Sequence, residues 1–405
     1  MVATLGSLRS QVAGIGRMVT GPSSSQEPFM GSNLPGATVT SLLTVGDEVP
    51  HADGDGTFSL VGIPDGMGAY DNGDGTFTLL VGHELRDNLG AERTHGGIGS
   101  FVSQFVVNKE TLEVVSGRDL ATSLLKWDGT SWLDDEEKAK SRFCSGELPP
   151  TSAFYNAQSG KGTTNRIYMN GEETGPPGMA FAHVIDGDDA RTTYSLPHLG
   201  RASWENSVAS PFAQDKTIVV LLDDSHDGEI YVYVGEKSTE GATSVEKAGL
   251  VGGALYGLRI PDKPYELSDG GIQHEDQEAF EMEPMGDIWE MEGEAFAELS
   301  LEKGVTRFAR PEDGVWDPRP GMENRFYWVT TGGRSNEVTG ASRLWCIEFT
   351  DINRPELGGT QTILLDSWKP NARFRNLDNM TMDLNGIIYL QEDSGSSSHL
   401  ARIYA

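Results

Sequence analysis

The sequence predicts an all-β protein, folded as a single β-propeller with short helical insertions. Short runs rich in Val, Ile, Tyr, Trp and Thr recur along the chain, and most are four to eight residues long. Gly supplies 50 of the 405 residues and Pro supplies 19, and both are spread between these runs rather than gathered in one linker. Convincing helical periodicity is rare. These three observations favour many short strands joined by tight turns.

The expected strands are bounded by Gly, Asn, Asp or Pro, which are common residues of turns. In chain order they are Thr76–Val81, Phe101–Asn108, Arg166–Asn170, Thr217–Asp223, Ile230–Gly235, Ala254–Ile260, Arg325–Thr331, Arg343–Phe349, Thr362–Asp366 and Ile387–Gln391. Two short acidic segments, Asp134–Lys140 and Glu290–Leu299, are the expected helices. Neither segment defines a domain of its own.

A propeller is the expected arrangement because an all-β chain of this length must protect the edges of its sheets. Antiparallel blades repeated around a central channel do this. A faint internal repeat agrees, since residues 53–58 read DGDGTF, residues 72–77 read NGDGTF, and both carry the Asp-Gly signal of a hairpin. We expect six blades, with residues 1–35 as an N-terminal arm and 36–405 as a metallohydrolase-like propeller domain. Two smaller domains are the alternative at this length.

The charge of the chain excludes some classes of partner. Asp and Glu number 61 against 31 Lys and Arg, so the formal net charge is −30, and repulsion disfavours nucleic acid and anionic membrane surfaces. No run approaches the roughly 20 apolar residues of a membrane span, and residues 1–35 lack the continuous apolar stretch of a signal peptide. We therefore expect no stable membrane insertion, in a chain from which any signal peptide has been removed.

Seven acidic clusters mark places where a predicted strand meets a loop. They are His83-Glu84, Glu172-Glu173, Glu205-Asn206, Asp223-Asp224, Glu312-Asp313, Asp378-Asn379 and Glu392-Asp393. In a propeller the loops at strand ends converge on one face, so these side chains can surround one centre, where their repulsion would be costly without cations. Carboxylate, amide and carbonyl oxygens suit Ca²⁺. For any single pair, a solvated turn is the alternative.

The two cysteines differ in their setting. Cys144 lies beside a turn, where a thiolate would suit a transition metal such as iron better than calcium, and a buried inert thiol is an equally good interpretation. Cys346 lies in an apolar run and is expected in the core, and one bridge between the two cysteines is the alternative. The motifs of serine hydrolases, zinc metalloproteases and Walker-type nucleotide hydrolases are missing from the sequence.

Stretches spread between residues 82 and 393 together resemble the PhoX-type alkaline phosphatase family, and their order along the chain is similar to the family's. They are 82–85 (GHEL), 143–146 (FCSG), 170–173 (NGEE), 200–205 (GRASWE), 219–224 (VVLLDD) with 230–231 (IY), 252–256 (GGALY), 306–312 (TRFARPE) and 377–379 (LDN) with Asp383 and Gly386. The joint pattern is far more specific than any one stretch.

The resemblance implies an extracytoplasmic phosphomonoesterase that hydrolyses organic phosphate esters at a centre containing Fe³⁺ and Ca²⁺. Cys144 would be an iron ligand, and the metal ligands would further include Glu84, Glu172, Glu173, Glu205, Glu312 and Asp378. Arg310 would contact phosphate oxygens through its forked guanidinium, Arg201 is a weaker second choice, and Arg307 is expected in a salt bridge. The protein would be secreted, periplasmic or on the cell surface, and its partner would be a small-molecule phosphate ester.

The chain departs from the family pattern at several points. It is shorter, carries no twin-Arg export signal, has an extended interval at 153–164, and has Asp313 where an aromatic residue is common. Two alternatives therefore stay open. One is another calcium-dependent propeller hydrolase, such as a phosphodiesterase, a phytase-like enzyme or a lactonase. The other is a non-catalytic, calcium-stabilised surface propeller, which predicts calcium without iron and gives Cys144 no role.

Overall fold

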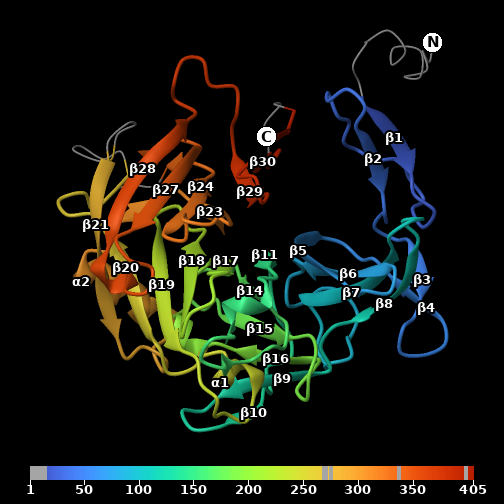
Figure 1. The fold of residues 1–405 in the computed structure, drawn as a ribbon, viewed down its shortest axis with the longest axis horizontal. Coiled ribbons are helices and arrows are strands. Elements are labelled where there is room, and N and C mark those ends of the chain that lie inside the picture. The colour runs from blue at the N-terminus through green and yellow to red at the C-terminus, as the bar shows by residue number, and fades with distance from the viewer. Residues whose placement is uncertain (1–15, 267–271, 273–276, 335–338, 396–399) are drawn as a thin grey trace. The chain divides into compact units, whose positions relative to one another are not determined.

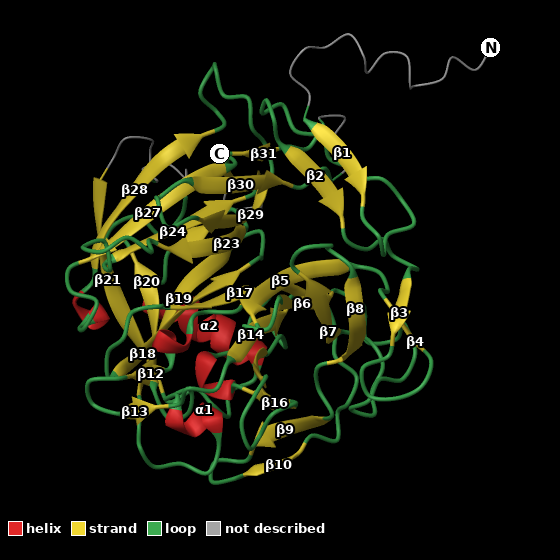
Figure 2. Ribbon diagram, turned by 45° about the vertical axis from the view of Figure 1, so that its right-hand side comes forward, coloured by secondary structure: helices red, strands yellow, loops and turns green. Residues whose placement is uncertain are grey.

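The computed structural model describes residues 16–266, 272, 277–334, 339–395 and 400–405. In this part of the chain strands predominate and helices are short (Figures 1 and 2), which confirms the mostly β prediction. All ten predicted strands are present, and Phe101–Asn108 and Arg343–Phe349 have the predicted bounds. Among the described residues, none of the helices has the length and apolar character that crossing a membrane requires.

The chain divides into two compact units. Unit 1 comprises residues 1–64, 69–81 and 102–119, and unit 2 comprises residues 65–68, 82–101 and 120–405. The predicted boundary between an arm and a propeller domain stays a prediction.

Unit 1 contains two strand pairs and most of a four-stranded sheet. The pairs are β1 (Arg17–Thr20) with β2 (Thr38–Ser41), which run parallel, and β3 (Glu48–Pro50) with β4 (Thr57–Ser59), which run antiparallel. The sheet has the order β5 (Pro64–Asp71), β6 (Thr76–His83), β7 (Phe101–Asn108) and β8 (Val114–Asp119). The turn between β5 and β6 has the predicted hairpin chemistry, because Gly73 and Gly75 have positive φ and Asp71 accepts a hydrogen bond from the Gly73 N–H at 2.7 Å.

Unit 2 contains a six-stranded sheet in which four antiparallel strands form a module. These are β11 (Phe143–Glu147), β14 (Ile167–Glu172), β15 (Ala180–Val184) and β16 (Thr192–Ser195), with β11 at the sheet edge. β9 (Ser123–Trp127) pairs in parallel with β16, and β10 (Trp132–Asp134) pairs with β9. A short hairpin of β12 (Tyr155–Asn156) and β13 (Lys161–Gly162) lies outside this sheet.

A ten-stranded sheet supplies two further antiparallel modules of unit 2. The first is β17 (Trp204–Ala209), β18 (Lys216–Asp223), β19 (Gly228–Glu236) and β20 (Ala254–Arg259). The second is β23 (Pro311–Trp316), β24 (Arg325–Thr330), β27 (Arg343–Phe349) and β28 (Gly359–Asp366). β21 (Gln277–Gly286) pairs with both β20 and β28, and β22 (Arg307–Phe308) pairs with β19. The remaining strands are β29 (Leu377–Met382), β30 (Ile388–Glu392) and β31 (Ile403–Tyr404) in one sheet, and the pair β25 (Gly333–Arg334) and β26 (Thr339–Gly340).

The central strands of unit 2 are buried on both faces. Along β18, Val219 and Leu221 belong to one apolar cluster, whereas Val220 and Leu222 belong to another. Successive side chains of a strand point to opposite faces, so one strand serves two cores. The continuous apolar run of β18 therefore reflects a sheet packed on both sides rather than a solvated edge.

One predicted helix is present and the other is wrong. α2 (Gly293–Lys303) corresponds to the predicted Glu290–Leu299 and ends at Gly304 in the left-handed conformation, while α1 (Ser244–Lys247) is a single short turn. Residues 135–140 form no helix. The Asp135 carboxylate accepts hydrogen bonds from the Glu137 N–H at 3.0 Å and from the buried Lys140 Nζ at 2.8 Å. This acceptor stabilises a turn in place of a helix.

Candidate metal centre

Four strands of unit 2, β11, β17, β23 and β29, carry a potential metal ligand at the same place, an irregularity in the pairing with the neighbouring strand. The register shifts lie between Phe143 and Gly146, Trp204 and Asn206, Pro311 and Gly314, and Leu377 and Met380. The second residue of each irregular stretch is Cys144, Glu205, Glu312 or Asp378. A β-bulge disrupts the ladder locally and redirects a side chain, so the four ligands share one structural origin.

A second potential ligand follows the neighbouring strand and is fixed by a recurring backbone hydrogen bond. The N–H groups of Glu173, Asp224, Thr331 and Asp393 donate to the carbonyls of Arg142, Ser203, Arg310 and Asn376, at distances of 2.8 to 3.1 Å. Each acceptor stands two positions before the ligand on the bulge. Arg142, Arg310 and Asn376 have φ values of 50°, 61° and 48°, a region that residues other than Gly rarely adopt.

Three overlapping groups of ligand atoms result. They are Asp65, Glu84 and Cys144; Cys144, Glu173 and Glu205; and Glu205, Asp224 and Glu312. Within each group the ligand atoms lie within 4.8 Å of one another. Because Cys144 and Glu205 are shared, the groups form one continuous cluster of seven residues inside unit 2. We call these seven residues the acidic centre.

Within the described residues, some buried oxygens of the acidic centre have no hydrogen-bond partner. Glu205 and Glu312 are each 1% exposed, and among the described residues both oxygens of Glu205 and Oε1 of Glu312 lack a hydrogen-bond partner. An unsatisfied buried carboxylate is expensive, and a bound cation would satisfy it. Oxygen donors suit calcium and the Cys144 thiolate suits iron, so the residues present fit both metals.

Burial, and after it the crowding of like charges, raises the pKa values in and around the acidic centre. Burial, followed by the charges of Glu84 and Asp313, raises the pKa of Asp65 to about 7. Burial and the neighbouring Asp65 raise the pKa of Asp378 to about 8. For Glu205 and Glu312 the same causes raise the pKa well above the usual range. The protein therefore retains protons here at neutral pH unless cations replace them.

Two arginines border the acidic centre. Arg310 donates from Nε and Nη2 to the two oxygens of Asp224, at 2.8 and 2.7 Å. Its Nη2 also lies 3.0 Å from Glu312 Oε1, although the angles are not those of a hydrogen bond. Arg142 forms ion pairs with Glu84, at 2.9 Å, and with Glu173. Both side chains are about one third exposed, at 32% and 33%, so neither arginine is fully buried.

The structure brings together five of the seven predicted metal ligands, namely Glu84, Cys144, Glu173, Glu205 and Glu312. Asp378 occupies the equivalent bulge position and interacts electrostatically with Glu205 and Glu312, but it lies outside the three groups. Glu172 accepts a hydrogen bond from the Ser141 N–H at 3.0 Å and also lies outside them. Since Glu172 and Glu173 are consecutive, they tend to point in opposite directions, and only Glu173 faces the cluster.

Sequence reasoning missed Asp65, Asp224 and Arg142. Asp224 belongs to a recognised acidic cluster, and its position after β18 matches that of Glu173 after β14, which could have identified it. Asp65 lies on β5, whose Pro and Gly residues are poor strand formers, so no strand end marked it. Arg142 stands two residues before Cys144, as Arg310 stands two residues before Glu312, and this shared spacing is its only signal.

The remaining predicted residues lie elsewhere. The Arg201 side chain donates from Nη1 to the Pro177 carbonyl at 3.3 Å, its one hydrogen bond within the described residues, and it lines a separate cavity. Arg307 forms the expected salt bridge, with Asp227 at 3.2 Å. Cys144 and Cys346 are both free, so the alternative of a disulfide between them is wrong. Cys346 packs against an apolar cluster, as its sequence setting predicts.

Comparison with known proteins identifies one family. The model of the family described as alkaline phosphatase PhoX matches residues 127–403, which include every residue of the acidic centre except Asp65 and Glu84. The fold is similar to that of PhoX from Pseudomonas fluorescens, solved in complex with vanadate, a transition state analogue. That match has a TM-score of 0.61 and 13% identity and covers 84% of this chain and 77% of that chain.

A second solved structure and the curated proteins give no further information on the fold or the family. A putative 6-phosphogluconolactonase from Bacteroides uniformis matches over 82% of this chain and 95% of its own, with 11% identity and a TM-score of 0.24 that is too low to indicate a shared fold. Among curated proteins, no sequence matches significantly.

Proposed function

The chain belongs to the alkaline phosphatase PhoX family, a family of phosphomonoesterases, and we propose that it hydrolyses organic phosphate monoesters at an iron and calcium centre. The observation that carries this proposal is the buried acidic centre next to the partly exposed Arg310, because both oxygens of Glu205 lack a hydrogen-bond partner among the described residues. The match to the family model confirms the family predicted from the sequence. The metals and the substrate range are our proposal.

The residues that would hold the cations are those of the acidic centre, with Asp378 adjoining. Cys144 would bind iron, and the carboxylates would divide between iron and calcium. When bound, the cations would neutralise the charge of the phosphoryl group and polarise its oxygens as Lewis acids.

Arg310 would bind the phosphoryl group directly. Asp224 engages its Nε and Nη2, and among the described residues Nη1 has no hydrogen-bond partner. The guanidinium is thus held along one edge while Nη1 can donate to a phosphate oxygen. One protein with this fold binds vanadate, a transition state analogue, which supports a phosphoryl site here. Arg142 would orient Glu84 and Glu173 through its ion pairs.

We further propose that the antiparallel modules are blades of a single β-propeller. Recurrence of the bulge, of the backbone hydrogen bond and of the ligand position in several modules supports this architecture. Six blades and secretion to the periplasm or cell surface stay predictions from the sequence. An experimental structure would count the blades, and cell fractionation would test the location.

A comparison of substrate classes tests the function. The metal-loaded protein should hydrolyse 4-nitrophenyl phosphate at least about 100-fold faster, in kcat/KM, than bis(4-nitrophenyl) phosphate, phytate or a γ-lactone, because the site is proposed for a monoester dianion. Faster turnover of the diester, phytate or lactone would replace the monoesterase proposal with the corresponding hydrolase. No turnover of any of them would favour a structural role for the metals.

A further inference from the structure

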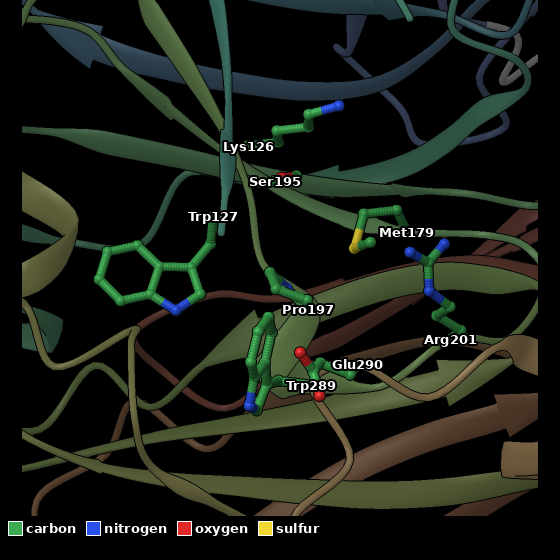
Figure 3. Close-up of a pocket in the computed structure, with 8 residues that line it drawn as sticks. All are labelled: Lys126, Trp127, Met179, Ser195, Pro197, Arg201, Trp289 and Glu290. Carbon is green, nitrogen blue, oxygen red and sulfur yellow. The ribbon is translucent and has the colours of Figure 1, made fainter. Parts of the chain in front are cut away.

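A cavity of about 460 Å³ lies in unit 2, apart from the acidic centre (Figure 3). Its lining shares no residue with the acidic centre. The lining residues are Lys126, Trp127, Met179, Ser195, Pro197, Arg201, Trp289 and Glu290. They come from β9, from the residue before β15, from the end of β16 and the segment between it and β17, and from the segment before α2. A cavity of this volume can take a small organic molecule.

Two tryptophans line the cavity, with their ring planes in different orientations (Figure 3). The ring of His198 lies 6.4 Å from that of Trp127 and 6.3 Å from that of Trp289, at interplanar angles of 56° and 24°. Trp132 packs against Trp127 at 5.1 Å. Gly129 has a φ of 100°, and a Cβ there would lie 2.8 Å from the Trp289 ring, so the absence of a side chain allows this close contact. The two indoles are therefore held before any ligand arrives, which favours binding of a planar ring.

Two cations line the same cavity without a carboxylate partner. Among the described residues, neither Lys126 nor Arg201 forms an ion pair, although the chain has 61 acidic residues. Arg201 interacts electrostatically with Glu172 but makes no hydrogen bond to it. Its Nε is buried and has no hydrogen-bond partner in the described chain. Since this Nε is inaccessible to solvent, an anion in the cavity would contact the other guanidinium donors, of which Nη1 already donates to the Pro177 carbonyl.

We propose that this cavity binds an organic anion that carries a flat ring. The ring would pack on Trp127 and Trp289, and the acidic group would lie at Arg201 and Lys126. Neutral rings would leave the cations unpaired, and small anions would leave the indoles uncovered. Glu290 lies on the same lining and opposes the ligand by charge repulsion, which gives the proposal a distinctive test.

The test measures binding of non-hydrolysable probes to the metal-loaded protein by titration calorimetry. 2-Naphthalenesulfonate has both ring and charge, 2-naphthalenemethanol has only the ring, and methanesulfonate has only the charge. We expect the first to bind at least about tenfold more tightly than either of the others. Equal or tighter binding of the neutral alcohol or of methanesulfonate would overturn the proposal.

Variants locate the probe in this cavity. Arg201→Gln should weaken 2-naphthalenesulfonate binding about tenfold, and Trp289→Leu roughly fivefold. Glu290→Gln should strengthen it about threefold, a gain that misfolding cannot produce. Exposed residues outside the cavity provide matched controls, Arg354→Gln and Trp368→Leu, which should leave the affinity unchanged. Unchanged binding in Arg201→Gln, or weaker binding in Arg310→Gln at the acidic centre, would overturn the proposal.

Discussion

Glu205→Gln should stabilise the metal-free protein and destabilise the metal-loaded protein. The Glu205 ligand atom lies within 4.8 Å of those of Asp224 and Glu312. Coulomb's law at an effective dielectric constant of about 20 then gives a repulsion of about 3.5 kcal/mol for each ionised pair. Retained protons relieve part of it, so removal of the charge should raise the free energy of unfolding of the metal-free protein by about 2 kcal/mol. For a chain of this length that corresponds to an increase of about 2 °C in Tm.

With metals bound the same substitution acts in the opposite direction. Gln lacks the charge of a carboxylate ligand, and a loss of about 100-fold in cation affinity removes about 2.7 kcal/mol of ligand-linked stability, or about 3 °C in Tm. Differential scanning calorimetry in the presence of chelator and then of iron and calcium measures both shifts. The matched control is Glu302→Gln, an exposed residue of α2, which should change neither. A shift of the same sign in both conditions would refute the reasoning.

Other predictions concern pH and individual side chains. In the metal-free protein, Asp65 and Asp378 have pKa values of about 7 and about 8 against roughly 3.9 unfolded, so the folded state binds more protons. Stability should therefore fall as pH rises from about 4 to 8, and a Tm that instead rises with pH in chelator would contradict this. Arg310→Gln should lower kcat/KM for 4-nitrophenyl phosphate about 100-fold with metal content unchanged, whereas loss of the metals would mark Arg310 as structural. Cys144→Ser should lower bound iron at least about tenfold by elemental analysis, and retained iron would remove Cys144 from the site.

Ten of the strands could be predicted because local composition decides them. β7 and β27 are rich in β-branched and aromatic residues and end at turn residues, and their bounds match the prediction. Other strands were not predicted, among them β5, because Pro64, Gly66 and Gly68 disfavour a strand unless neighbouring strands hold it. The helix expected at Asp134–Lys140 does not form because the Asp135 carboxylate accepts a hydrogen bond from the Glu137 N–H and stabilises a turn. Helical periodicity does not reveal that a side chain can replace the helical hydrogen bonds in this way.

The acidic centre could be predicted only in part, because it depends on backbone detail. The metal ligands that the family resemblance implied include five of its seven members, four carboxylates and Cys144. The bulges that redirect Cys144, Glu205 and Glu312 have no clear sequence signal, and neither has the choice of Glu173 over Glu172. Asp65 depends on an unpredicted strand. The ligand residues are brought together by the register in which strands far apart in the sequence pair, and local strand propensity does not determine that register.

Elemental analysis of the purified protein, paired with hydrolysis of 4-nitrophenyl phosphate, is the most direct test of the proposed iron and calcium phosphatase. We expect bound iron together with calcium, and turnover that is lost on chelation and recovered when both metals are restored. Calcium without iron, with no turnover under any metal condition, would contradict it and favour a metal-stabilised propeller without catalysis.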